Sequence, residues 1–276
     1  MTEIQDKIIL ITGATSGMGE YMATELARQG ATVLLHGRSS KSAEQAAAAI
    51  RTKSGSDRIR TYHADFGSLH EVRAMVDDIT MYETHLDVLI NNAGIGGGRP
   101  FGKREVSQDG YELRFAVNYL APYVLTKELL PLLKHSAPSR TVNVASAGQQ
   151  PIDFSDIMLE RSYGQARAYM QSKLAVIMMT FDMADELKSV GVTCNALHPA
   201  TFMNTKMVRQ SFIPPTSSVK SGAEPTLHLA ISPELEGITG QYFDQYSESR
   251  AIAQAYDLQA RKQLRELTEI LVNRVL

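Results

Sequence analysis

Short runs of β-branched and aliphatic residues alternate with longer stretches of helical periodicity along most of this chain. The short runs predict strands at residues 8–12, 32–36, 59–62, 88–91, 140–145 and 192–197. The longer stretches predict helices at residues 19–29, 41–52, 69–82, 110–134 and 167–190. Strands that alternate with helices of ten or more residues are typical of βαβ units, so the pattern predicts an α/β protein with a parallel sheet. The apolar run Ile8-Ile9-Leu10-Ile11 indicates a strand that is buried on both faces.

Two segments interrupt this alternation directly after predicted strands. One is the glycine-rich stretch 94–104, and the other is 199–218, which contains Pro214 and Pro215. Ligands of open α/β sheets bind beyond the carboxyl ends of the strands, so both segments are candidate pocket walls. The length of 276 residues would allow two domains, but we expect one domain over 1–276. In it, 199–218 forms a substrate loop and 244–276 a C-terminal tail with a surface helix.

Composition and charge narrow the class of protein. With 43% hydrophobic and 21% charged residues, the chain is not a long disordered protein. The net charge of −2 predicts neither nucleic-acid binding nor attraction to an anionic membrane. The single cysteine, Cys194, excludes an internal disulfide and favours a reducing compartment. Without an apolar run of 18 residues or a signal peptide, we expect no membrane span and a cytoplasmic location.

The segment 12–19 carries glycines at 13, 17 and 19, between the first strand and the first helix. Glycine allows the tight turn that such a junction needs. It also lets a pyrophosphate approach the backbone N–H groups at the positive end of a helix. The spacing differs from the usual G-x-G-x-x-G. Taken alone, the loop also fits an ordinary strand-to-helix turn.

A tyrosine and a lysine, Tyr169 and Lys173, lie four residues apart on a predicted helix and so share one face. A lysine ammonium at ~4 Å favours a phenolate by ~4 kcal/mol, or about three pKa units, which would bring the tyrosine pKa from near 10 towards neutrality. Ser146 ends the fifth strand, where its hydroxyl can donate to a substrate oxygen. A lone Tyr-x-x-x-Lys pair is most often a surface pair, but the glycine loop and Ser146 favour acid–base chemistry.

In combination, these motifs resemble the short-chain dehydrogenase/reductase superfamily. The sequence contains its Thr12-Gly-x-x-x-Gly-x-Gly19, its Asn91-Asn-Ala-Gly94 and its Tyr169-x-x-x-Lys173, in the family's order. The resemblance extends over residues 7–243. It implies a doubly wound Rossmann fold, with a parallel sheet of about seven strands in the order 3-2-1-4-5-6-7 and helices on both faces.

The resemblance also implies a catalytic group of four residues. Tyr169 gives or takes the proton, and Ser146 orients the carbonyl or hydroxyl. Lys173 holds the nicotinamide ribose and tunes Tyr169. Asn118 anchors a water that links Lys173 to solvent, although an asparagine that bonds its own helix backbone is the alternative reading. We expect no metal, since the seven histidines show no ligand spacing.

The expected cofactor is NADP(H). Gly37 occupies the family's acidic position after the second strand, and Arg38 follows it. A guanidinium can grip a 2′-phosphate, whereas a carboxylate would repel it. Arg38 could instead be a solvated surface residue, and Asp65 could be a helix cap. The implied cofactor-binding residues are Gly13, Thr15, Ser16, Gly17, Met18, Gly19, Arg38, Ser39, Asp65, Phe66, Asn92, Ala93, Gly94, Tyr169, Lys173, Pro199 and Thr205, the last one position later than usual.

The substrate side is similar to the retinol dehydrogenase and protochlorophyllide reductase-like branch, because Ser146 and Tyr169 lie 23 positions apart. Apolar residues of this spacer either line a greasy pocket or pack the loop down: Ile152, Phe154, Ile157, Met158 and Leu159. Residues of the substrate loop either contact substrate or anchor the loop: Phe202, Met203 and Met207. We therefore expect an NADP(H)-dependent oxidoreductase that reduces a carbonyl or oxidises an alcohol of an apolar small molecule.

Other readings stay open. The same tyrosine and lysine serve C=C bond reduction in the related protochlorophyllide enzymes, and a nucleotide-sensing protein without turnover would keep the pocket. Family members often pair through the segments that correspond to 110–134 and 167–190, so a homodimer or homotetramer is compatible with the sequence.

Overall fold

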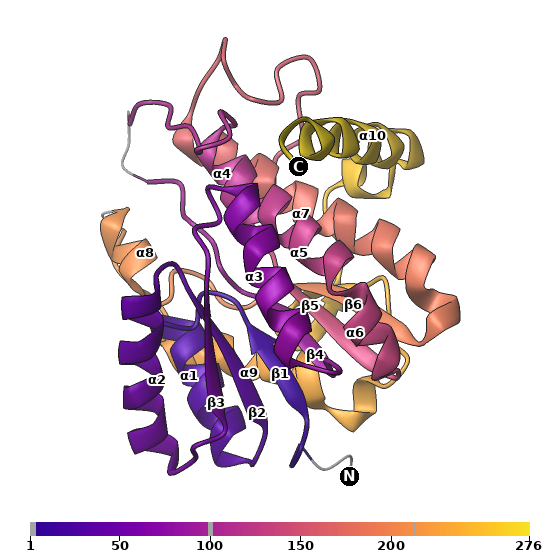
Figure 1. Ribbon diagram of the computed structural model, residues 1–276. Helices are drawn as coiled ribbons and strands as arrows, with labels where there is room; N and C mark the ends of the chain where they lie inside the picture. Colours follow the sequence, from indigo (N-terminus) through magenta and orange to yellow (C-terminus); the bar gives the residue numbers. More distant parts are fainter. Residues whose placement is uncertain (1–3, 99–101, 212) are drawn as a thin grey trace.

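The computed structural model describes residues 4–98, 102–211 and 213–276. Its centre is an eight-stranded sheet in the order β3-β2-β1-β4-β5-β6-β7-β8 (Figure 1). The strands are β1 (Ile8–Ile11), β2 (Thr32–Gly37), β3 (Ile59–His63), β4 (Val88–Asn91), β5 (Ser139–Val144), β6 (Val192–His198), β7 (Tyr242–Asp244) and β8 (Ser247–Ser249). The predicted order of the first seven strands is confirmed.

The prediction of about seven strands missed β8, which pairs antiparallel with β7. The two strands form a hairpin in which Asp244 faces Ser247, so only Gln245 and Tyr246 make the turn. Gln245 has a φ of 55° there, without the glycine or asparagine that usually signals such a turn. Because β8 reads Ser-Glu-Ser and is largely exposed, it carries no hydrophobic pattern from which a strand could be predicted.

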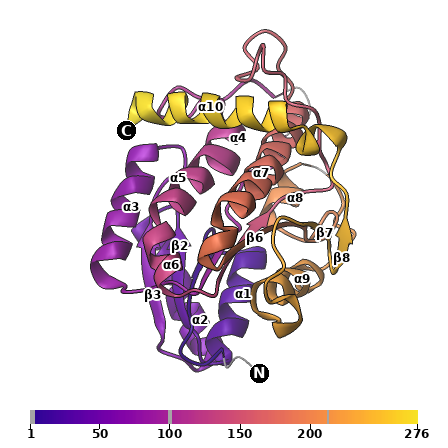
Figure 2. The same ribbon diagram turned by 90° about the vertical axis from the view of Figure 1, so that its right-hand side faces the viewer.

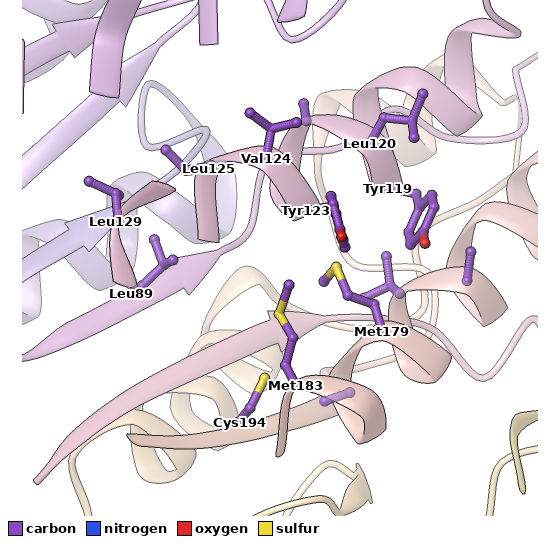
Figure 3. Close-up of a cluster of buried hydrophobic side chains, with 14 of the residues drawn as sticks. Leu89, Tyr119, Leu120, Tyr123, Val124, Leu125, Leu129, Met179, Met183 and Cys194 are labelled. Atoms are coloured by element: carbon purple, nitrogen blue, oxygen red, sulfur yellow. The ribbon is translucent and has the colours of Figure 1, made fainter. Parts of the chain in front are cut away.

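Helices cover both faces of the sheet, as two separate hydrophobic clusters show. On one face Ile9 and Ile11 pack beneath α1 (Gly17–Arg28), α2 (Ser40–Ser54) and α9 (Val219–Ile231). On the other face Leu10 packs beneath α3 (Leu69–Tyr82), α5 (Ala121–Glu128) and α7 (Gln165–Leu187). Figure 3 shows part of the second cluster, where Met179 and Met183 of α7 face Tyr119 and Tyr123. The two-sided burial that was expected for β1 is therefore confirmed.

The helix predicted over 110–134 is broken into several pieces. They are α4 (Leu113–Phe115), a π-helical turn (Ala116–Leu120), α5 and α6 (Leu130–His135). Pro122 and Pro131 each stand in the first turn of a piece and supply no backbone N–H. In the π turn the N–H of Ala121 donates to the carbonyl of Ala116 instead of the residue four back. The apolar pattern continues through these breaks, which is why it predicted one long helix.

The C-terminal tail is fastened to the rest of the chain. Its helix α10 (Leu258–Val275) follows a 3-10 turn (Ala253–Tyr256) and lies across α7 and α3 (Figure 2). Thr268 bonds the Tyr119 hydroxyl at 2.7 Å, and the Leu271 carbonyl accepts from the Tyr111 hydroxyl at 2.7 Å. One side of α10 is exposed, and the other buries Leu264 and Leu271. Among the described residues, no helix is both long and apolar enough to cross a membrane.

We predict that the tail contributes to global stability. Leu264 is 2% exposed in the core, whereas Leu258 on the same helix is 72% exposed. Leu264→Ala should lower the free energy of unfolding by about 2–5 kcal/mol, because it leaves a cavity, while Leu258→Ala should change it by less than about 0.5 kcal/mol. Denaturant titration of both variants measures this. If Leu264→Ala lowered the free energy of unfolding as little as Leu258→Ala does, α10 would be only loosely attached.

Candidate active site

The glycine loop lies at the carboxyl end of β1 and has no space for side chains at two positions. Gly13 has a φ of 66°, which favours glycine. A Cβ on Gly19 would lie 2.4 Å from the Gly13 carbonyl oxygen. Helix α1 begins at Gly17, and the hydroxyl of its N-cap residue, Ser16, makes no capping bond. The first N–H groups of α1 are therefore not capped by that side chain, as a phosphate site requires.

The end of β4 holds this loop from one side. Asn92 Nδ2 donates to the carbonyls of Thr12 at 2.7 Å and Gly13 at 3.2 Å. In return, Thr12 Oγ1 accepts from the backbone N–H groups of Asn92 and Ala93, both at 2.9 Å. The structure thus brings two segments of predicted cofactor residues, 12–19 and 92–94, into direct contact.

His36, which was not among the predicted site residues, holds the loop from the other side. Its Nδ1 accepts from the Gly13 N–H at 3.0 Å, so Nε2 carries the proton that it donates to the Ala64 carbonyl at 3.0 Å. Its ring stacks on Phe66, with 4.4 Å between centroids. Burial lowers the pKa of His36 to about 4, which keeps the ring neutral. The available signal was a histidine inside an otherwise apolar strand, one residue before Gly37.

Of the residues expected at the adenosine end, some are exposed to solvent and some make hydrogen bonds or packing contacts within the protein. Arg38 and Ser39 are exposed after β2, and Ser39 also caps α2. Asp65 is not the helix cap that was considered, because Ser68 caps α3 while Asp65 Oδ1 accepts from the Gly67 N–H at 2.9 Å. A Cβ on Gly37 would lie 2.6 Å from Thr15 Cγ2, so this glycine is also needed for packing.

The four predicted catalytic residues come from three parts of the fold. Ser146 follows β5, Tyr169 and Lys173 lie on α7, and Asn118 lies in the π turn. Ser146 Oγ accepts from the Gly148 N–H at 3.0 Å, which leaves its own proton free to donate. Lys173 Nζ donates to the Val144 carbonyl at 2.7 Å, and this bond anchors α7 at the end of β5.

The electrostatics of the pair differ from the expectation. Lys173 Nζ lies 5.9 Å from the centroid of the Tyr169 ring. Burial raises the pKa of Tyr169, and the nearby Ser146 hydroxyl offsets part of that rise. Burial also lowers the pKa of Lys173 to about 8. In the protein alone, removal of both groups from water therefore outweighs the attraction that was predicted to lower the tyrosine pKa.

Asn118 does not bond its own helix backbone, which was the alternative reading. Its Oδ1 accepts from the Ile95 N–H at 2.8 Å, and its Nδ2 donates to the Ile95 carbonyl at 3.0 Å and to Ser172 Oγ at 2.9 Å. A Cβ on Gly94 would lie 3.1 Å from Asn118 Oδ1 and 3.6 Å from Lys173 Nζ. Asn118 therefore fixes the loop after β4 against the lysine.

The apolar spacer residues pack the loop down. Ile152 and Leu159 are buried, and Phe154, Ile157 and Met158 pack against the same core as α7. The structure therefore favours anchoring over a greasy pocket lining for these five residues.

The substrate loop lies close to the glycine loop and to the segment after β4. Pro199 is buried after β6. Thr205 caps α8 (Lys206–Gln210), and its Cγ2 would lie 3.4 Å from a Cβ on Gly17. Met207 lies against Gly96 in the same way, at 2.8 Å. The side chain of Met18 packs on α9, so only its backbone can face a ligand.

Comparisons with known proteins agree with this architecture. A sequence model of the family described as "short chain dehydrogenase" matches residues 7–214. Human retinol dehydrogenase 14 is 38% identical over 96% of this chain and 86% of its own length. Human retinol dehydrogenase 13 is 34% identical, over 95% and 83% respectively.

Solved structures agree as well. The 3-ketoacyl-(acyl-carrier-protein) reductase from Brucella melitensis, in complex with NADH, superimposes with a TM-score of 0.70 at 27% identity, covering 87% of this chain and 97% of that one. A protein from Escherichia coli CFT073 that is assigned to the short-chain dehydrogenases, in complex with NADPH, gives a TM-score of 0.73 at 25% identity, covering 90% and 100%. The chain belongs to the short-chain dehydrogenase family, in the branch that contains the retinol dehydrogenases.

Proposed function

We propose that the protein is an NADP(H)-dependent oxidoreductase that interconverts a carbonyl and an alcohol on an apolar small molecule. The observation that carries the proposal is the convergence of Ser146, Tyr169 and Lys173 at the strand ends beside an uncapped helix α1. Relatives named retinol dehydrogenase support an apolar alcohol as substrate class. Neighbours in complex with NADPH and NADH support a nicotinamide dinucleotide.

The crevice fits such a cofactor. Its pyrophosphate would lie at the start of α1, where backbone N–H groups and the glycines of the turn allow close approach. Arg38 and Ser39 would hold the 2′-phosphate, and Asp65 would face the adenine, with Phe66 behind it. Asn92, Ala93 and Gly94 would border the ribose held by Lys173, and Pro199 and Thr205 the carboxamide. When bound, the nicotinamide supplies or accepts the hydride.

The side chains of this protein supply the proton and hold the oxygen. In reduction, the Tyr169 hydroxyl gives its proton to the substrate oxygen; in oxidation, the phenolate takes it back. Ser146 donates a hydrogen bond to the same oxygen, because its acceptor side is occupied by the Gly148 N–H. The Lys173 ammonium favours the phenolate through its positive charge. Val144 and Asn118 keep the lysine and the Gly94 loop in place.

Replacement of the proposed acid tests the chemistry. Tyr169→Phe keeps the ring and removes the hydroxyl, so turnover should fall by ~10² or more while dinucleotide affinity is retained. The control is Tyr246→Phe, on a tyrosine that is 53% exposed in the β7–β8 turn. Assays over ketone, aldehyde and enone panels with both nucleotides give the measurement. Near-parental turnover of Tyr169→Phe would overturn the assignment.

Replacement of Arg38 tests the cofactor preference. Arg38→Leu should lower the ratio of kcat/KM for NADPH over NADH by about ten- to a hundredfold, since one charge-assisted bond is worth about 1.5–3 kcal/mol. An aspartate at Gly37 is unsuitable for this test, because its Cβ would collide with Thr15. Arg274→Leu, on an exposed arginine of α10, is the control. A wild type that prefers NADH would show that Arg38 does not select the cofactor.

Replacement of His36 tests the loop that binds the pyrophosphate. His36→Leu leaves the partly buried Gly13 N–H without its acceptor, a loss of about 1–3 kcal/mol. Dinucleotide Kd should therefore rise about tenfold, with little change in kcat at saturating cofactor. The control is His63→Leu, because His63 is exposed at the end of β3. If Kd stays unchanged, the contact between His36 and Gly13 does not shape the binding site.

A further inference from the structure

The backbone carbonyl of Ser146 is held by two side chains. Tyr242 donates to it through its hydroxyl at 3.1 Å, and Gln149 donates through Nε2 at 3.1 Å. Ser146 is 8% exposed, and its own Oγ accepts from the Gly148 N–H at 3.0 Å. The turn from Ser146 to Gln149 is therefore closed by two internal hydrogen bonds, one to the serine hydroxyl and one to the serine carbonyl.

The other end of the Gln149 amide reaches the C-terminal tail. Gln149 Oε1 accepts from the Ile252 N–H at 3.0 Å. Two residues later in the tail, Gln254 pairs with the backbone of Ile152: its Oε1 accepts from the Ile152 N–H at 2.6 Å, and its Nε2 donates to the Ile152 carbonyl at 3.1 Å. Two amide side chains thus join segment 149–152 to segment 252–254.

The tail also forms hydrogen bonds with the other catalytic elements. Arg261 of α10 bonds Asp182 and Asp185 of α7, each at 2.7 Å, on the helix that carries Tyr169. Thr268 bonds Tyr119, which is the residue after Asn118. The family match ends at residue 214, so in each of these contacts the tail residue lies outside the matched region and its partner lies inside it.

We infer that Gln149 is a positioning residue through which the C-terminal tail sets the orientation of Ser146. The inference rests on the proposed function, in which Ser146 holds the substrate oxygen. Gln149 touches neither substrate nor cofactor in this assignment, and it acts through the serine carbonyl. Small displacements of an orienting group cost much rate, up to ~10² for about 1 Å.

The test compares Gln149→Ala with Gln150→Ala, a change of the same side chain one residue away and outside the hydrogen-bond chain. Gln149→Ala should lower kcat about tenfold and leave dinucleotide Kd unchanged, while Gln150→Ala should leave both unchanged. Gln149→Glu keeps an acceptor for the Ile252 N–H but loses the donor to Ser146, so it should lower kcat by a similar factor.

A double-mutant cycle separates a positioning role from general weakening of the fold. In a Ser146→Ala background, Gln149→Ala should have no further effect on kcat, because the hydroxyl that Gln149 is inferred to position is gone. A further tenfold loss there, or wild-type kcat for Gln149→Ala or Gln149→Glu, would overturn the inference. A wild-type protein without turnover on any carbonyl or alcohol would instead overturn the proposed function.

Discussion

The cofactor half of the site depends on a backbone turn that cannot accept a side chain at Gly13 or at Gly19. At Gly19 a Cβ would collide with the carbonyl of Gly13. That carbonyl cannot move aside freely, because Asn92 donates to it and His36 holds the N–H of the same residue. The N–H of Gly13 is therefore fixed by His36 of β2, and its carbonyl by Asn92, which directly follows β4. As a result, β1, β2 and β4 meet in one rigid edge.

The catalytic half depends on a cation that is kept away from water. Lys173 is buried, and burial disfavours its charged form. The Val144 carbonyl takes one of the three N–H donors of the ammonium, and the Gly94 loop lies close by. Desolvation acts in the opposite direction on Tyr169 and raises its pKa. Burial disfavours the charged form of each side chain, but it also strengthens the attraction between a charged Lys173 and a charged Tyr169, since the local dielectric is low.

Much of the sheet and the positions of the motifs could be predicted from the sequence, because buried parallel strands carry strong apolar runs. The predictions stopped where the determining contacts are between residues distant in sequence. The role of His36 depends on Gly13, Ala64 and Phe66, which no local pattern connects. Polar β8 gave no hydrophobic signal, and the direction of the spacer residues depends on a core that the tail helps to build.

The π turn before α5 has a consequence for how this chain can vary. A π turn holds one residue more than the corresponding α-helical turn. Each residue of an α-helix rotates its neighbour by about 100° around the axis. Loss of one residue between Ala116 and Leu120 would leave a regular helix, yet it would turn Asn118 relative to the apolar positions that follow. Insertions and deletions are therefore not tolerated equally along this segment. A single-residue deletion here would keep the fold but move Asn118 out of its place in the site.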